Sequence, residues 1–403
     1  MNGRIPLLFE IGVEEIPHWM IRPALGEMER IFRDLCESHR IEPGALRLDA
    51  TPRRMVLRSD GLPERQPDRE ELVLGPPKSA GDGAAQGFAR KNGVTMADLI
   101  VEITPKGEYF ALRKRTEGRP VREILAEILP ELIRRIPWPK TMYWTGKGGP
   151  TFIRPIRWIA ALFGDQVVEF SFAGVAAGPL TCGHRRLGAK EIVFDHATYE
   201  DRLEKNGVII DAGRRRQRIE AGIRRLLRGT GLEWVRDEAL LEDLVYLTEF
   251  PTPVMGRFDE RFLDLPREVL TTVMRHHQRY FTVQDGEGRL APRFIAIMNM
   301  KADRKGYVVK GNERVLEARF TDARFFWELD RQQTLESRLE RLRNVTFQAR
   351  LPQVPLPVAT RLPCPADVTT TASAARSFQD PLTYPLAMSE MKPVTVLVII
   401  PSA

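Results

Sequence analysis

The residues nearest the N-terminus that could do chemistry are the carboxylates Glu10, Glu14 and Glu15. Closely spaced carboxylates can transfer protons in acid–base catalysis or hold a magnesium ion. No histidine, lysine or nucleophile pattern accompanies them in the sequence. We therefore predict that these side chains form salt bridges or cap local structure, and that they do not form a catalytic pair.

The only adjacent histidines are His276 and His277. Neighbouring side chains point to opposite faces of a strand, or about 100° apart on a helix, so one metal ion rarely binds both. The surrounding segment places donor groups beside two aromatic rings: Arg275, His276, Gln278 and Arg279, then Tyr280 and Phe281. This mixture suits RNA, whose phosphates bind guanidinium groups and whose unpaired bases stack on rings. A buried hydrogen-bond network holding two lobes together is an equally consistent interpretation.

The densest basic stretch runs from Arg214 to Arg228. If it is a helix, Ile219, Ile223 and Leu226 face the core and the arginines face outward. Such a run is usually a solvated face. Because only Glu220 compensates the positive charge inside it, contact with phosphates is the alternative interpretation.

Sequence signatures of catalysis are missing. The chain contains no GxxxxGK[ST] phosphate loop, no HExxH, no GxSxG and no CxxC, and neither HIGH nor KMSKS. Its three cysteines, Cys36, Cys182 and Cys364, are too far apart in sequence to suggest a disulfide framework or a zinc site. We predict no catalytic, cofactor-binding or metal-binding residue in this chain.

Composition favours an ordinary folded protein with a polyanionic partner. The chain has 403 residues, a net charge of +7 and 43% hydrophobic residues. Lysine and arginine neutralise phosphates and release condensed counterions, so a basic balance favours nucleic acid. No uncharged apolar run is long enough to span a membrane, and the N-terminus lacks the features of a secretory signal. We expect a cytoplasmic protein.

Hydrophobic periodicity predicts an α+β fold of several lobes, with mixed helices and antiparallel sheets. Strands are expected near residues 7–11, 54–58 and 168–172, and a hairpin over 280–298. Helices are expected at 25–35, 121–135 and beyond Asn312, and an exposed loop over 61–83. The expected domains are an N-terminal α+β lobe over 1–135, a second α+β lobe with a basic surface over 136–350, and a tail over 351–403.

The tail differs sharply in composition from the rest. Six residues from 351 to 403 are charged, against 109 in the first 350, and the tail contains nine prolines. Prolines break helices and interrupt central strands. We expect the tail to be disordered, and a truncation followed by an out-of-frame reading would produce such a sequence.

Several residue strings, taken together in this order, resemble one family, the beta subunits of heterotetrameric bacterial-type glycyl-tRNA synthetase, up to about residue 350. The strings lie at residues 8–17, 51–54, 87–91, 152–158, 183–185, 249–253, 274–281, 311–319 and 322–326. Two departures, Tyr143 and Cys182, stand where the family usually has arginine. The resemblance implies a fragment of a longer subunit, because the family continues with an HD-type domain and an anticodon-binding domain.

The resemblance also implies a division of labour within an α2β2 tetramer. The alpha subunit carries the class II catalytic core, where ATP and magnesium are used, and the beta subunit binds glycine tRNA. No cofactor is expected on this chain. The side chains predicted to contact RNA are Arg53, Arg54, Arg154, Arg157, His184, Arg185, Arg275, His276, Gln278 and Arg314. The alternative is a truncated, non-catalytic RNA-binding or scaffold protein derived from that subunit.

Overall fold

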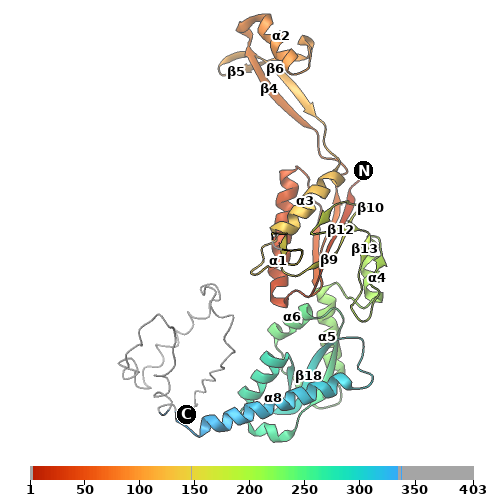
Figure 1. Cartoon of the computed structure of the whole chain (residues 1–403), viewed down its shortest axis with the longest axis vertical. Helices are drawn as coiled ribbons and strands as arrows, with labels where there is room; N and C mark the ends of the chain where they lie inside the picture. The colour runs from red at the N-terminus through yellow and green to blue at the C-terminus, as the bar shows by residue number, and fades with distance from the viewer. Residues whose placement is uncertain (1–2, 147, 335–336, 338–403) are drawn as a thin grey trace. The chain divides into compact units, whose positions relative to one another are not determined.

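The computed structural model describes residues 3–146, 148–334 and 337 (Figure 1). Helices are interspersed with sheets in which almost all neighbouring strands are antiparallel. The predicted α+β class is therefore confirmed. The predicted disordered tail, 351–403, lies outside the described residues.

The largest sheet has the strand order β11-β12-β9-β1-β3-β2, with β10 paired to β9. Its long strands are β1 (Ile5–Val13), β2 (Leu46–Thr51), β3 (Arg54–Leu62) and β9 (Ile156–Phe163). Strand β1 is central and antiparallel to both β3 and β9. Its side chains alternate between two faces, so Phe9 and Leu8 enter different hydrophobic clusters.

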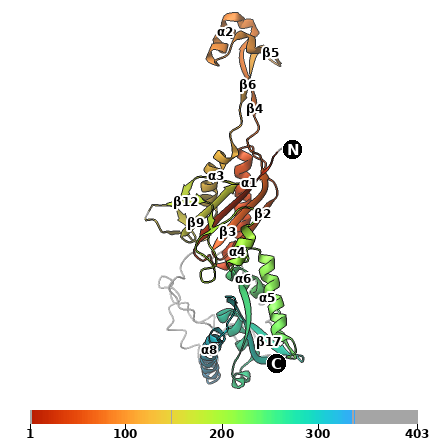
Figure 2. The same ribbon diagram turned by 90° about the vertical axis from the view of Figure 1, so that its right-hand side faces the viewer.

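Helices α1 (His18–Ser38) and α3 (Val121–Arg135) cover one face of this sheet (Figure 2). Their apolar residues recur every three or four positions and face Phe9 and its neighbours. Both predicted helices are confirmed. Helix α1 begins seven residues earlier than the apolar stripe indicated, which leaves Pro23 inside it.

Short strands and one helix complete this region, and the helix packs on the face of the sheet opposite α1 and α3. They are β7 (Met142–Tyr143), β8 (Thr151–Phe152), β10 (Gln166–Val167), β11 (Ser171–Phe172), β12 (Val175–Gly178), β13 (Leu180–Thr181), β14 (Ile192–Val193) and α4 (Tyr199–Lys205). The strand expected near 168–172 is thus limited to two residues. Because β9 pairs with β1, the predicted lobe boundary at residue 135 falls inside the unit built on this sheet.

A three-stranded sheet lies within the first 120 residues and has the order β4-β6-β5. It comprises β4 (Arg69–Pro77), β5 (Leu99–Thr104) and β6 (Gly107–Thr116), with η1 (Lys78–Ala80), α2 (Gly81–Lys91) and η2 (Met96–Asp98) between β4 and β5. The predicted exposed loop over 61–83 is wrong, because β4 pairs with β6. That partner lies far along the chain, so local composition did not reveal the strand.

A four-stranded sheet, β15-β17-β18-β16, follows and carries helices on both faces. Helices α5 (Ala212–Leu227) and α6 (Glu238–Leu247) pack on one face, and α7 (Arg267–Thr272), the π-helical segment η4 (Val273–Gln278) and α8 (Tyr307–Arg331) on the other. The remaining elements are β15 (Leu232–Trp234), β16 (Pro251–Arg257), η3 (Glu260–Asp264), β17 (Phe281–Asp285) and β18 (Leu290–Asn299). The predicted hairpin and final helix are confirmed.

Candidate nucleic-acid interface

Gly12 opens a position on the central sheet for the Trp158 ring. A Cβ atom at residue 12 would lie 1.9 Å from that ring, so only glycine fits beneath it. Trp158 in turn donates from Nε1 to Glu10 Oε1 at 2.7 Å. Strand alternation therefore places a carboxylate, an indole and the neighbouring Arg54 on the same face of the sheet.

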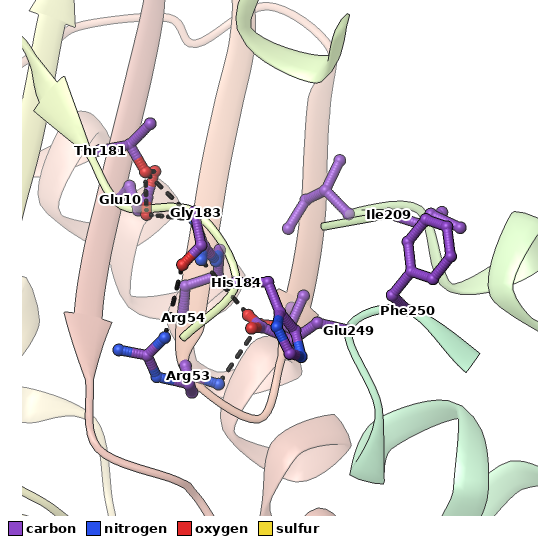
Figure 3. Close-up of polar contacts among 12 residues, drawn as sticks. Glu10, Arg53, Arg54, Thr181, Gly183, His184, Ile209, Glu249 and Phe250 are labelled. Carbon is purple, nitrogen blue, oxygen red and sulfur yellow. Dashed lines mark hydrogen bonds and ion pairs between the residues drawn. The ribbon is translucent and has the colours of Figure 1, made fainter. Parts of the chain in front are cut away.

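Arg54 lies at the centre of a buried ion network with Glu10 and Glu249 (Figure 3). Its Nη1 donates to Glu10 Oε1 at 3.1 Å and its Nη2 to Glu249 Oε1 at 3.3 Å. Glu10 accepts further bonds from Thr181 Oγ1 and from the Tyr199 hydroxyl, both at 2.7 Å. Five segments of the chain are joined here.

The three charged side chains of this buried ion network are at most 1% exposed. Burial alone would lower the pKa of Arg54, but Glu10 and Glu249 outweigh it and hold that pKa above its usual value. Arg54 therefore stays charged and neutralises buried carboxylates. This burial corrects the prediction that Arg54 contacts RNA.

His184 is only 4% exposed and lies beside the same network (Figure 3). Burial lowers its pKa, partly offset by the charge of Glu249 and a hydrogen bond with Asn299. The imidazole is thus neutral near pH 7, and the prediction of RNA contact is corrected for His184 as well. Burial also raises the pKa of the Cys182 thiol.

Four other predicted residues gather near Glu14 and Glu15, and we call this set the arginine surface: the exposed Arg157 and Arg185 and the half-buried Arg53 and Arg154. Arg157 Nε bonds Glu14 Oε1 at 2.8 Å, and Arg185 pairs with the other oxygen of Glu14. Arg154 Nε donates to the Glu15 carbonyl at 3.2 Å. Half-buried Arg53 reaches the Gly183 carbonyl at 3.5 Å. The structure therefore brings together residues from three separate sequence strings.

Glu14 organises the arginine surface without neutralising it. Partial burial works against its charged form, but the hydrogen bond from Arg157 and the charges of Arg185, Arg157 and Arg53 lower its pKa. The Arg157 and Arg185 side chains remain 57% and 53% exposed. The four arginines outnumber Glu14 and Glu15, which leaves net positive charge at the arginine surface. The predicted salt-bridge role is confirmed for Glu10 and Glu14.

The predicted residues Arg275, His276 and Gln278 occupy the π-helical segment η4. Arg275 pairs with Asp237 and also contacts His276, with 3.1 Å between Nη1 and Nε2. The neighbouring Tyr280 is buried and stacks on Phe294 with centroids 4.7 Å apart. Tyr280 is therefore inaccessible as a stacking platform for bases, whereas exposed His276 and half-buried Gln278 remain candidates.

The basic stretch forms helix α5, and one of its arginines points inward. Arg215 is fully buried and donates to the carbonyls of Ala50, Ile209, Ile210 and Val245 at 2.7–2.8 Å. Burial lowers its pKa to about 10. The sequence could have predicted this burial, because Arg215 precedes the buried Ile219 by four positions and therefore lies on the same face of the helix.

The part of the chain that the structure describes holds no cluster of three or more histidine, cysteine or acidic side chains arranged to bind a metal ion. No helix within that part is both long and apolar enough to cross a bilayer.

Comparison with known proteins places these features in a family. Residues 7–355 match the family described as glycyl-tRNA synthetase beta subunit. The glycine--tRNA ligase beta subunits of Trichlorobacter lovleyi and Geobacter sulfurreducens are each 45% identical over 353 residues, covering 86% of this chain and 51% of each relative. That of Acidobacterium capsulatum is 44% identical over 357 residues. The chain spans about half the length of the curated relatives it matches. It belongs to the glycyl-tRNA synthetase beta subunit family.

Proposed function

We propose that this chain is the tRNA-binding part of a glycine--tRNA ligase beta subunit. In this role it holds glycine tRNA while the alpha subunit attaches glycine in an ATP-dependent reaction. ATP and magnesium are used on the alpha subunit, and this chain binds no cofactor. The assembly is an α2β2 tetramer in the cytoplasm.

The observation that carries the proposal is the arginine surface. Arg157 and Arg185 are exposed, and the single carboxylate of Glu14 fixes both guanidinium groups. A guanidinium presents a planar fork of donors that matches phosphate oxygens, so fixed and exposed arginines favour phosphate binding. Family membership supplies the identity of the RNA, because the relatives are named for glycine and its tRNA.

Salt dependence of tRNA binding tests the proposal. The complete chain would be titrated with a glycine tRNA transcript at several salt concentrations, as wild type and as Arg157→Gln and Arg185→Gln. Removing one phosphate-binding guanidinium should flatten the slope of log affinity against log salt by about 0.7–0.9. Glycylation in the presence of the alpha subunit should fall in parallel.

Arg134→Gln is the matched control, since Arg134 is an exposed arginine paired with a carboxylate, Glu131, on helix α3. Its slope should equal that of wild type. A wild-type chain without affinity for the transcript would refute the proposal. Unchanged slopes with a lower melting temperature would show that Arg157 and Arg185 only hold the fold together.

A further inference from the structure

A second group of cations lies between strands β16 and β18 and helix α8, and we call it the strand–helix cluster: Arg257, Arg293, Lys310 and Arg314. Arg257 and Arg293 are directly opposite each other in the β16–β18 register. Like charges at opposed positions destabilise a sheet unless a counterion separates them. Lys310 and Arg314 are four residues apart on α8, which is a second unfavourable like-charge pair.

None of these four side chains forms an ion pair within the described residues. This contrasts with the arginine surface, where Glu14 binds two arginines. The nearby carboxylates are engaged elsewhere: Glu313 Oε1 accepts the Arg257 backbone N–H at 3.0 Å, and Glu317 pairs with Arg261 at 3.0 Å. Two like-charge pairs therefore face one space, and none of the four cations has an ion-pair partner among the described residues.

That space is an open concavity of about 580 Å³. All four cations of the strand–helix cluster line it, together with Asp259, Glu260 and the two engaged glutamates. Phe258 and Pro292 are its only non-polar lining residues, and Phe258 is buried. Protein interfaces usually centre on exposed aromatic or aliphatic anchors, which this concavity lacks. Phosphate groups, which can accept hydrogen bonds from cations without an ion-pair partner, therefore fit it better than the apolar anchor of a protein partner.

We propose that the strand–helix cluster binds backbone phosphates of the tRNA, at a contact separate from the arginine surface. The inference rests on the proposed function for the identity of the RNA. Arg257 and Arg293 supply planar donors from the sheet, and Lys310 and Arg314 supply flexible ones from the helix. A row of bound phosphates would reduce the electrostatic repulsion within both like-charge pairs at once. Binding is therefore favoured by the arrangement of cations in the free protein.

The test uses the complete chain carrying Lys310→Gln and Arg314→Gln together. Both side chains are exposed on a helix and glutamine favours helix, so folding should be retained. Removing these two cations should flatten the salt slope by about 1.4–1.8 and weaken binding of the glycine tRNA transcript roughly 10- to 30-fold at physiological salt. The charge-conserving pair Lys310→Arg and Arg314→Lys should bind like wild type.

The matched control substitutes glutamine for Arg122 and Arg135, two exposed arginines of helix α3 that form no ion pair within the described part of the chain. An equal fall in affinity in this control would show non-specific attraction and overturn the inference. Wild-type slope and affinity in the Lys310/Arg314 variant would also overturn it, while leaving the proposed function intact if the Arg157 variant still shows its effect. The inference would also be overturned if the Lys310/Arg314 variant kept wild-type affinity for tRNA but no longer associated with the alpha subunit. That result would assign the strand–helix cluster to a protein partner.

Discussion

Arg53 and Arg54 are neighbours in one sequence string, yet they belong to regions with opposite roles. Arg54 is fully buried between Glu10 and Glu249, whereas half-buried Arg53 lies at the arginine surface. A buried guanidinium is retained because its removal would leave carboxylates without a partner. An exposed one gains little stability from its ion pair and remains available to a ligand. Burial and ion-pair partners, and not residue type, separate arginines that stabilise the fold from arginines that remain open to a ligand.

The largest effect that this comparison predicts is on stability, for Arg54→Met. Two buried carboxylates would lose their counterion, which should lower the free energy of unfolding by about 3–5 kcal/mol. Urea unfolding followed by tryptophan fluorescence measures this directly, because Trp158 donates to Glu10 in the same network. Arg157→Gln, at the arginine surface, should change the same quantity by less than about 1 kcal/mol.

The order of the two effects should reverse when tRNA binding is measured in place of stability, with Arg157→Gln having the larger effect. Arg157→Gln should flatten the salt slope, and folded Arg54→Met should keep it. A stable Arg54→Met protein with a flattened slope would place Arg54 in contact with RNA and abolish the distinction between the two regions.

A second comparison, within helix α5, predicts a smaller difference. Arg215→Leu should lower the free energy of unfolding by about 2–3 kcal/mol, because four carbonyls lose a charged donor. Its neighbour Arg214 is exposed and pairs with Glu204 at 2.8 Å, so Arg214→Leu should cost less than about 1 kcal/mol. Equal costs measured by urea unfolding would contradict the structural role given to Arg215.

Local periodicity predicted the elements that depend on neighbouring residues. Helix α3 begins and ends where its apolar stripe indicated, and the β17–β18 hairpin follows its glycine-containing turn. Strand β4 was missed because its partner β6 lies beyond an intervening helix and strand.

The candidate site was predictable only in part, for a related reason. Resemblance to the family selected the strings that meet at the arginine surface. It did not separate Arg54 from Arg53, because the partner that helps bury Arg54, Glu249, lies 195 positions away. Only the tertiary structure shows which arginine is enclosed.

The smallest predicted effect concerns His184, at the edge of the buried ion network. Burial lowers its pKa in the folded protein, so the folded state binds fewer protons than the unfolded state. Its stabilising contribution is therefore complete above about pH 6.5 and is lost as pH falls toward the folded pKa, by at most about 1.4 kcal/mol per pH unit. His184→Asn should flatten the dependence of unfolding free energy between about pH 7 and pH 5.5. His18 and His196 also have pKa values lowered by burial, so part of the dependence should persist. An unchanged profile in His184→Asn would mean that protonation of this imidazole does not disturb the network.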